Sequence, residues 1–420
     1  MTIKTLSFGC RLNAVECEKI SAMLSNTIDD AILVNTCSVT AEAERQCAQT
    51  VRKLSRENPN AVIFVTGCGA TRNPKLFLSV PHAFVIDNAD KTNLRVYIAA
   101  LKSANIDPET SRTDVFKSNE GRLSKKFIRV QNGCNHDCAY CITRFLRGPN
   151  TSYPYDEILS DVRAAIADGF YEIVLTGVDT ASYMRRENGQ LFMLADLCAA
   201  LLRDVPEMKH LRLSSIDPAS PEVPKIIALM KADSRFMPHL HLSMQSGSDP
   251  ILRTMRRRHN ADKLRELVRL SDGYVSFSAD IICGFPGETA DLFNETADLV
   301  REMGLINVHA FPFSPRPGTV AAGLPNQVNR AESKKRVKII YDIVAQNRAK
   351  FMQSQIGKTV SVLVEENNIG RTPDDIDIKT IDKFPSGGGG DPTGGEGIPN
   401  KTICDIKITG IENSVFLGAK

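Results

Sequence analysis

The stretch "KFIRVQNGCNHDCAYC", residues 126–141, joins a strand-like run to a loop that carries Cys134, Cys138 and Cys141. A structural zinc site usually closes with four ligands from two short pairs, and no second pair matches this loop. His136 lies inside the first spacer, where the geometry for a fourth ligand is poor. Three thiolates can instead hold three irons of a cubane iron–sulfur cluster and leave the fourth iron open for substrate. The spacing therefore favours a cluster over zinc, and the polar flanks disfavour three buried core thiols.

Strand and helix patterns alternate from this strand-like run onward. Six strand-like runs lie near 127–131, 172–176, 210–215, 238–244, 276–283 and 306–313. Helix-like segments separate them, which predicts a parallel (β/α)6 barrel, closed or partly open. Because chemistry in such barrels sits on the loops after the strands, we expect the cysteine loop at the barrel mouth.

The rest of the chain predicts two further domains, giving an α/β protein of three parts. Strand-like runs at 3–8, 31–36 and 61–67 alternate with amphipathic helices, which is typical of a mostly parallel α/β sheet. Strand-like runs near the end flank a glycine-rich stretch, so we expect a small β domain with a long insertion. The predicted boundaries are 1–104 for the sheet domain, 105–125 for a linker, 126–350 for the barrel and 351–420 for the β domain.

Composition bounds the class of protein. The 420 residues are 42% hydrophobic, which is ample for real cores, and the net charge of +3 alone does not identify a nucleic-acid binder. No apolar run approaches the ~18 residues of a membrane span, and no secretory leader opens the sequence, so we expect a cytoplasmic protein without membrane contact. Clustered thiols among the eleven cysteines then indicate metal binding or chemistry, not disulfides.

Three cysteines of the first domain occupy equivalent positions. Cys10, Cys37 and Cys68 each follow one of its three strands. The carboxyl ends of parallel strands line one edge of a sheet, so these thiols could converge on one point. Small buried residues at strand ends are the alternative, but three in the same context favour ligation. The cysteines that we expect in the core or in a structural role are Cys17, Cys47, Cys198 and Cys404.

The loop at 133–141 resembles the signature of the radical S-adenosylmethionine (SAM) superfamily, including Tyr140 before the last cysteine. The resemblance implies that SAM chelates the open iron and is cleaved by one electron to a deoxyadenosyl radical. Stretches after the later strands match cofactor positions of this superfamily. The matching residues are Thr176, Gly177, Ser214, Gln245, Cys283, Gly284 and Phe285. We expect Cys283 and Phe285 to bound the adenine, and Gly284 to let the backbone approach it.

A domain with "GC-x-x-N", "NTCSV" and "GC", followed by such a barrel and a β tail, is similar to the methylthiotransferase family over essentially the whole chain. The resemblance implies that Cys10, Cys37 and Cys68 hold a second 4Fe-4S cluster that delivers sulfur. It also implies that the tail is an RNA-binding TRAM domain. The product would be a methylthio group on an unactivated carbon.

The phrase "FGCRLNAVECEK" is most similar to the branch that acts on threonylcarbamoyl-adenosine in tRNA. That branch implies methylthiolation of C2 at position 37 of the anticodon stem-loop, with two 4Fe-4S clusters and two SAM. An electron donor such as flavodoxin or ferredoxin and a sulfur source would be needed as partners. Alternatives are the branches for isopentenyl-adenosine in tRNA and for a ribosomal-protein aspartate. From another class, an RNA-binding protein with structural metal sites also stays open.

Basic residues concentrate in two segments of the barrel. RNA binding through phosphate contacts would weaken as salt rises, whereas a solvated helix face is the alternative for each residue. The candidates are Arg256, Arg257, Arg258, Lys334, Lys335 and Arg336. Two features depart from the family pattern: Arg144 replaces an expected proline and Thr151 an expected arginine, while Arg147 and Gly148 keep the arginine–glycine pair. The glycine-rich stretch at 384–397 interrupts the tail.

Overall fold

A computed structural model describes residues 3–25, 27–28, 31–104, 106, 124–187, 189–365, 369–380 and 403–419. The chain forms two compact units, which we call the N-terminal unit and the barrel unit. The N-terminal unit comprises Met1–Gly121, Asn132–Asn150 and Ser314–Ala322, and the barrel unit comprises Arg122–Gln131, Thr151–Phe313 and Gly323–Lys420. Most of the expected linker at 105–125 and the whole glycine-rich stretch at 384–397 lie outside the described residues. No helix in the described ranges is long and apolar enough to cross a membrane.

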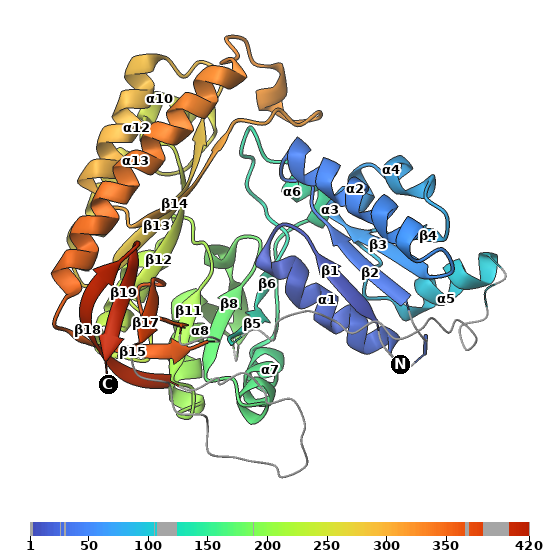
Figure 1. Cartoon of the computed structure of the whole chain (residues 1–420), viewed down its shortest axis with the longest axis horizontal. Helices are drawn as coiled ribbons and strands as arrows, with labels where there is room; N and C mark the ends of the chain where they lie inside the picture. The colour runs from blue at the N-terminus through green and yellow to red at the C-terminus, as the bar shows by residue number, and fades with distance from the viewer. Residues whose placement is uncertain are drawn as a thin grey trace. The chain divides into compact units, whose positions relative to one another are not determined.

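A four-stranded parallel sheet forms the centre of the N-terminal unit (Figure 1). Its strands, in spatial order, are β1 (Lys4–Ser7), β2 (Ala31–Thr36), β3 (Val62–Gly67) and β4 (Ala83–Val85). Its helices are α1 (Arg11–Leu24), α2 (Ala41–Glu57), α3 (Cys68–Arg72), α4 (Lys75–Leu78), α5 (Leu94–Ser103) and α6 (Thr143–Arg147). The three predicted strands are confirmed, and the short β4 is added to them.

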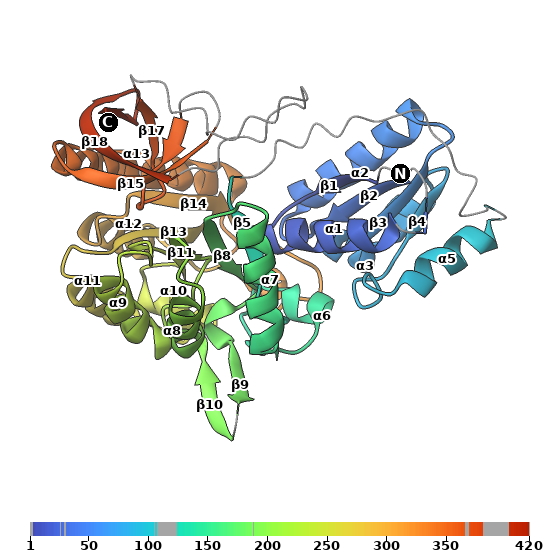
Figure 2. The same ribbon diagram turned by 90° about the horizontal axis from the view of Figure 1, so that it is seen from below.

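Side chains of β2 and β3 alternate between two hydrophobic cores, one on each face of this sheet. Val34 and Val65 pack with residues of α2, whereas Leu33 and Phe64 pack with residues of α1 and α5. Successive residues of a strand point to opposite faces, so strands covered on both faces become apolar throughout. Figure 2 shows helices on both sides of the blue strands. The result is an α/β/α layer structure that leaves the carboxyl ends of the strands to carry chemistry.

Six parallel strands form the partial barrel of the barrel unit. They make two three-stranded sheets, β5 (Lys126–Arg129), β8 (Glu172–Thr176), β11 (His210–Leu213) and β12 (His239–Gln245), β13 (Ser276–Cys283), β14 (Asn307–Pro312). The surrounding helices are α7 (Tyr155–Ala167), α8 (Leu194–Asp204), α9 (Glu222–Ala232), α10 (Asp249–Thr254), α11 (Ala261–Ser271), α12 (Ala290–Glu302) and α13 (Arg330–Gln355). Smaller elements are β6 (Gln131–Asn132), β7 (Thr151–Ser152), the hairpin β9 (Met184–Glu187) and β10 (Gln190–Met193), and the short turns Thr180–Ser182 and Val320–Gly323. The six predicted strands are confirmed.

The C-terminal strands close into a small barrel. Its spatial order is β15 (Thr359–Val364), β16 (Ile369–Arg371), β17 (Asp377–Thr380), β19 (Val415–Ala419) and β18 (Ile403–Glu412). An apolar core that includes Val362, Ile378, Ile406 and Phe416 fills it. The predicted α/β class with a parallel N-terminal sheet, a partial barrel and a small β domain is thus confirmed.

A buried polar network attaches the small barrel to the six-stranded barrel. The carboxylate of Glu172 is fully buried and accepts hydrogen bonds from Arg212 Nε at 2.9 Å, while its other oxygen lies 2.9 Å from His210 Nδ1. Arg212 also donates to the carbonyl oxygens of Thr372 and Pro373, at 2.8 and 2.6 Å. Burial raises the pKa of Glu172, but Arg212 and His210 outweigh it and hold this pKa far below its usual value. The ionised carboxylate therefore fixes the base of the small barrel.

Candidate active site

Cys10, Cys37 and Cys68 lie at the carboxyl edge of the N-terminal sheet. Cys10 precedes α1, Cys37 follows β2, and Cys68 begins α3 after β3. Gly9 has a left-handed φ of 88°, and a Cβ at this position would overlap Cys37 Sγ. Burial raises the pKa of the Cys37 thiol to about 12, and the thiols of Cys10 and Cys68 add to this rise. The three cysteines therefore lie at one edge of the sheet, and their joint ligation of a cluster stays a prediction.

The second cysteine loop belongs to the same N-terminal unit. Its turns are fixed by backbone hydrogen bonds from Cys134 N to Gly148 O and from Cys141 N to Cys138 O, each 3.1 Å. The amide of His136 donates to Cys134 Sγ at 3.4 Å. Amide donors to a sulfur stabilise its thiolate form, which is the form that ligates iron. Tyr140 lies in this loop, and its neighbour Ala139 accepts a hydrogen bond from Ala321 N at 2.8 Å.

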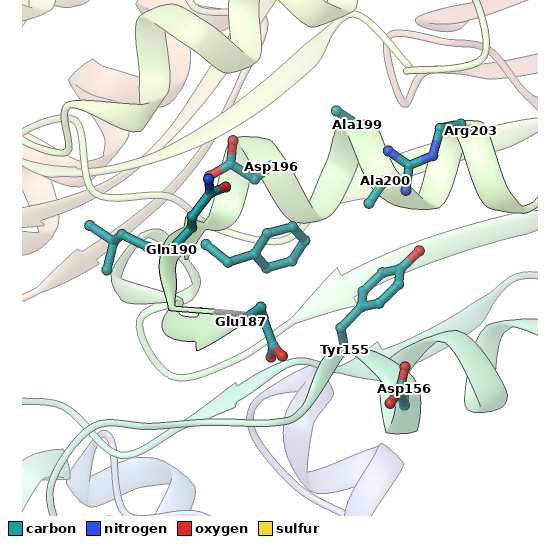
Figure 3. A pocket seen from close by; sticks show the side chains of 10 residues that line it. Tyr155, Asp156, Glu187, Gln190, Asp196, Ala199, Ala200 and Arg203 are labelled. Atoms are coloured by element: carbon teal, nitrogen blue, oxygen red, sulfur yellow. The ribbon is translucent and has the colours of Figure 1, made fainter.

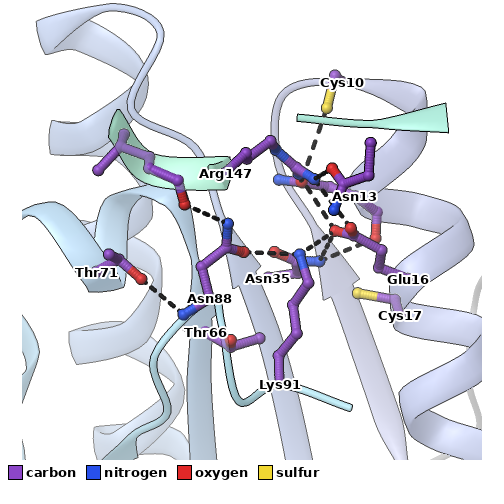
Figure 4. Close-up of polar contacts among 12 residues, drawn as sticks. Cys10, Asn13, Glu16, Cys17, Asn35, Thr66, Thr71, Asn88, Lys91 and Arg147 are labelled. Atoms are coloured by element: carbon purple, nitrogen blue, oxygen red, sulfur yellow. Dashed lines mark hydrogen bonds and ion pairs between the residues drawn. The ribbon is translucent and has the colours of Figure 1, made fainter. Parts of the chain in front are cut away.

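A buried charged network connects this loop to the sheet domain (Figure 4). Arg147 of α6 donates to Glu16 of α1 through Nη1 at 2.9 Å and Nη2 at 3.2 Å. Lys91 Nζ lies 2.6 Å from the other side of the same carboxylate, at Oε2. Arg147 also donates to Asn13 Oδ1, and Cys10 Sγ lies 3.7 Å from the same oxygen. The network therefore reaches from the loop of Cys134 to the first cysteine of the sheet edge.

The charges of this network favour an anionic group beside the cysteines. Burial alone would raise the pKa of Glu16, but Arg147 and Lys91 outweigh it, so this pKa is lowered. Burial raises the pKa of Cys68, whereas Arg147 and Lys91 act in the opposite direction. Two buried cations thus share one buried carboxylate, and the remaining positive charge lies next to the thiols. A cluster held by three thiolates is an anion that matches this surplus.

A second cation pair lies beside Cys37. Arg316 is buried and pairs with Glu44 Oε2 at 2.5 Å, and it also donates to Ser38 Oγ at 2.9 Å. Arg72 pairs with the same Glu44 oxygen at 2.8 Å. Ser38 is adjacent to Cys37 in the chain, so this ion-pair group holds the backbone next to a candidate ligand. The segment 314–322 thereby joins the N-terminal unit, although its sequence position predicted a place in the barrel.

Sequence reasoning missed several residues around the two cysteine sets. Cys47 was expected in the core, and it is buried, but its sulfur also accepts a hydrogen bond from Cys37 N at 3.4 Å. Glu16 could have been noticed, because it lies one turn from Leu12 and one from Ile20 on the apolar face of α1. A charged residue on an apolar helix face indicates a buried partner. Lys91 and Arg316 carry no such local signal.

Four expected SAM contacts lie at the carboxyl ends of barrel strands. Thr176 ends β8, and a Cβ on Gly177 would lie 2.7 Å from Gln131 Oε1, so only glycine fits there. Ser214 Oγ follows β11 and lies 3.1 Å from Thr180 Oγ1.

Gln245 ends β12 with a left-handed φ of 68°. Its buried Oε1 has no hydrogen-bond partner among the described residues. A buried acceptor without a partner is costly, and an amino group or hydroxyl of a ligand such as SAM would satisfy it.

Three further expected SAM contacts, those at the end of β13 and just after it, face the protein interior, whereas Tyr140 is half-buried. Cys283 is 1% exposed within the barrel core, and Phe285 is 0% exposed and packs against the ring of Phe313 with centroids 5.3 Å apart. A Cβ on Gly284 would overlap Ser333 of α13, so helix packing requires this glycine. Cys283 ends β13 on the side that faces the apolar core, and a contact of Cys283 or Phe285 with an adenine stays a prediction.

Two of the six expected RNA contacts are engaged inside the barrel unit. Arg336 is buried and pairs with Glu288 Oε2 at 2.7 Å, and Arg257 is paired with Asp217 Oδ1 at 3.2 Å. Both guanidinium groups stabilise the fold, which corrects the expectation that Arg336 and Arg257 serve RNA. The exposed candidates are Arg256, Arg258, Lys334 and Lys335. Of these, Arg258 also pairs with Asp217, at 3.1 Å.

A cavity of about 590 Å³ lies between the β9–β10 hairpin and helices α7 and α8 (Figure 3). Tyr155, Glu187, Asp196 and Arg203 are among its lining residues. The Tyr155 hydroxyl donates to Asp204 at 2.7 Å, which fixes one wall. This lining contains none of the residues expected to contact SAM, so we do not assign the cofactor to this cavity.

Comparison with known proteins agrees with a partial barrel that follows an N-terminal sheet domain. Residues 128–300 match the model of the radical SAM superfamily, and residues 2–87 match the uncharacterized protein family UPF0004. The chain is 38% identical to the threonylcarbamoyladenosine tRNA methylthiotransferase MtaB of Rickettsia prowazekii over 388 residues, covering 90% of this chain and 91% of that protein. It is 31% identical to the tRNA-2-methylthio-N(6)-dimethylallyladenosine synthase of Pelagibacter ubique, covering 86% of each chain.

Among solved structures, the fold is similar to the radical SAM methyltransferase TsrM of Kitasatospora setae, solved with cobalamin and a [4Fe-4S] cluster. The TM-score is 0.55 at 14% identity, covering 72% of this chain and 68% of that chain.

A six-stranded parallel barrel whose first strand leads into a C-x3-C-x2-C loop defines a radical SAM enzyme. With its N-terminal domain and its relatives, the chain belongs to the radical SAM methylthiotransferase family. [4Fe-4S] clusters and SAM are the cofactors of this family.

Proposed function

We propose that this methylthiotransferase modifies C2 of N6-threonylcarbamoyladenosine at position 37 of tRNA, next to the anticodon. The relative from Rickettsia prowazekii that is named for that substrate supports this proposal most, because it is 38% identical over about nine tenths of both chains. The relative from Pelagibacter ubique that is named for dimethylallyladenosine is less similar, at 31% identity. It favours isopentenyl-adenosine in tRNA as the second candidate substrate.

In this proposal Cys134, Cys138 and Cys141 hold the cluster that binds SAM. Cys10, Cys37 and Cys68 hold the auxiliary cluster that receives sulfur. When bound, the two clusters and two SAM supply the methyl group, the sulfur and the radical that the reaction needs. The hydrogen on C2 of adenine is neither acidic nor easily displaced, which explains why acid–base side chains alone would not suffice.

The chain's own residues position and shield these groups. Arg147, Glu16 and Lys91 tie the SAM-cluster loop to the auxiliary edge inside one unit. The side chains of these three residues are each at most 5% exposed. Gln245 offers its unpartnered Oε1 to a donor group of SAM, while Gly177 lets the chain turn closely past Gln131.

Nucleoside mass spectrometry tests the substrate directly. The gene is expressed in a bacterial strain that lacks methylthiotransferases for both adenosine types, and total tRNA is digested. We expect the 2-methylthio form of threonylcarbamoyladenosine to appear, and the threonylcarbamoyladenosine signal to fall. Methylthiolation of isopentenyl-adenosine alone would assign the second candidate instead. Unmodified tRNA together with a methylthiolated ribosomal protein would reject both.

A further inference from the structure

Strands β12, β13 and β14 carry a row of polar side chains on one face of their sheet. Their opposite face is apolar and belongs to the barrel core. Registered pairs on the polar face are His239 with Ser276, His241 with Ser278, and Asp280 with His309. Because side chains alternate along a strand, these six residues share one face. Three histidines and one carboxylate are thus gathered on one face of this sheet.

Two of these imidazoles converge on a single carboxylate oxygen. His241 Nε2 lies 3.0 Å from Asp280 Oδ1, and His309 Nδ1 lies 3.2 Å from the same atom. One ligand atom from each of the three residues lies within 4.8 Å of those of the other two, and the two imidazole centroids are 4.9 Å apart. Metal–ligand bonds of about 2.1 Å at right angles separate neighbouring ligand atoms by about 3.0 Å. The two distances to Asp280 Oδ1, 3.0 and 3.2 Å, match this ligand spacing, and the two imidazole nitrogens lie within 4.8 Å of each other.

A chain of hydrogen bonds through two serine hydroxyls and His239 fixes the orientation of His241. Its Nδ1 lies 2.8 Å from Ser278 Oγ, which in turn lies 2.9 Å from His239 Nε2. His239 Nδ1 lies 2.8 Å from Ser276 Oγ. Ligating histidines are typically held through their second nitrogen in this way, so that the first nitrogen points at the metal. This chain of hydrogen bonds therefore supplies the outer support that a metal site requires.

The carboxylate between the imidazoles carries the negative charge that a cation needs. Aspartate carboxylates are ordinarily ionised at neutral pH, and both imidazoles face Oδ1 of Asp280. The side chain of His309 is 64% exposed, so an ion can reach the triad from solvent.

We propose that His241, Asp280 and His309 form a binding site for one divalent transition-metal ion of the iron-to-zinc series. Two imidazoles and one carboxylate on one face are the ligand set that suits these ions. The remaining positions are open to water or to an oxygen-donor ligand. The site shares no residue with either cysteine set, and the proposal does not depend on the proposed tRNA substrate. In the alternative, no metal binds, and protons on the imidazole nitrogens form hydrogen bonds to Asp280.

Cobalt(II) is a suitable probe, because it can be counted separately from cluster iron and binds nitrogen and oxygen ligands readily. The reconstituted enzyme, with its clusters in place, is dialysed anaerobically to equilibrium against micromolar cobalt, and cobalt and iron per chain are measured by mass spectrometry. We expect the wild-type enzyme to bind one more cobalt per chain than His309→Ala or Asp280→Asn. Loss of one ligand should weaken binding at least about tenfold, since even outer partners of ligands contribute that much.

His82→Asn is the matched control, because His82 is exposed and has a φ of 56° that asparagine tolerates. This variant should bind cobalt like the wild type. Unchanged iron content and melting temperature in His309→Ala would exclude cluster loss or unfolding as the cause of cobalt loss. Equal cobalt binding by wild type, His309→Ala and Asp280→Asn, or none at about 100 μM, would overturn the proposal and leave the hydrogen-bonded alternative.

Discussion

Glu16 of α1 and Arg147 of α6 form a buried ion pair across 131 residues of sequence, with 2.9 Å between Oε1 and Nη1. The pair joins the helix after Cys10 to the loop after Cys141. Because Lys91 shares the same carboxylate, Glu16 pairs with two buried cations. This relationship links the two cysteine sets mechanically and electrostatically.

Replacing Glu16 by glutamine should destabilise the N-terminal unit strongly. Two buried cations would lose the carboxylate that they share, and breaking a buried pair in this way costs about 3–5 kcal/mol of unfolding free energy. Thermal unfolding measures this loss, and iron analysis shows whether cluster retention falls with it.

Arg147→Ala should behave similarly, whereas Arg144→Ala in the same loop is the control. Arg144 pairs with Asp137 at 2.7 Å near the surface, and such pairs contribute at most about 1 kcal/mol. If Arg147→Ala and Arg144→Ala melted at the same temperature, the network would not have the role that we give it.

The Cys37→Ala variant should distinguish the roles of the two cysteine sets. We expect iron to fall from about eight to about four per chain, because only the set at Cys134 would keep its cluster. Reductive cleavage of SAM to deoxyadenosine should persist, while methylthiolated product disappears. Product mass spectrometry and deoxyadenosine chromatography measure the two outcomes.

Cys134→Ala provides the reciprocal variant, in which deoxyadenosine formation should stop. Cys404→Ser, in the small barrel, should keep about eight irons and both activities. Normal product from Cys37→Ala would contradict the auxiliary-cluster proposal, and deoxyadenosine from Cys134→Ala would contradict the radical assignment.

Lys334→Ala and Lys335→Ala should weaken tRNA binding without destabilising the fold, because both side chains are exposed on α13. Each lost phosphate contact should reduce the slope of log K against log salt by about 1. Filter binding of the anticodon stem-loop at several salt concentrations measures this slope.

Lys53→Ala on α2 is an exposed lysine control that should leave the slope unchanged. Arg336→Ala should instead lower the melting temperature, because its removal leaves Glu288 buried without its cation. An unchanged slope in the double variant of Lys334 and Lys335 would remove α13 from the RNA-binding surface.

His259 should make stability depend on pH. Burial and Arg257 lower its pKa to about 4, below the value of about 6.5 in the unfolded chain. Between these values the unfolded chain binds the additional proton, so stability falls as pH decreases from about 6.5 toward 4. From pH 7.5 to 5.5 the loss should be roughly 1 kcal/mol.

Denaturant unfolding of wild type and His259→Gln at both pH values measures this contribution. The glutamine does not titrate and keeps an amide donor for Met244 O, which lies 3.1 Å from His259 Nε2. The difference in unfolding free energy between wild type and variant should therefore shrink at pH 5.5. A constant difference would show that His259 does not titrate in this window.

Local sequence patterns were sufficient to predict the architecture and the positions of the strand-end cysteines. Runs such as "AILVNT" and "AVIFVTG" predict strands covered on both faces, and the structure places β2 and β3 there. Parallel pairing then brings Cys10, Cys37 and Cys68 to one edge, as a general property of α/β sheets.

Polar and apolar side chains alternate along β13, and this pattern predicts the burial of Cys283. Ser276, Ser278 and Asp280 share one face, so Cys283 falls on the opposite, apolar face with Phe277 and Ile281. Its burial could therefore have been predicted from period-two alternation alone. The same alternation predicts that His309 shares a face with the polar residues, but not that it meets Asp280.

The sequence by itself determined the fold class, the two cysteine sets and the family, because each depends on local spacing or strand-end position. Only the tertiary structure decided that Arg147 pairs with Glu16 and Lys91, that Arg336 is buried, and that His241, Asp280 and His309 converge. Such contacts join residues distant in sequence, and their energies depend on burial and charge neutralisation, which no local periodicity records.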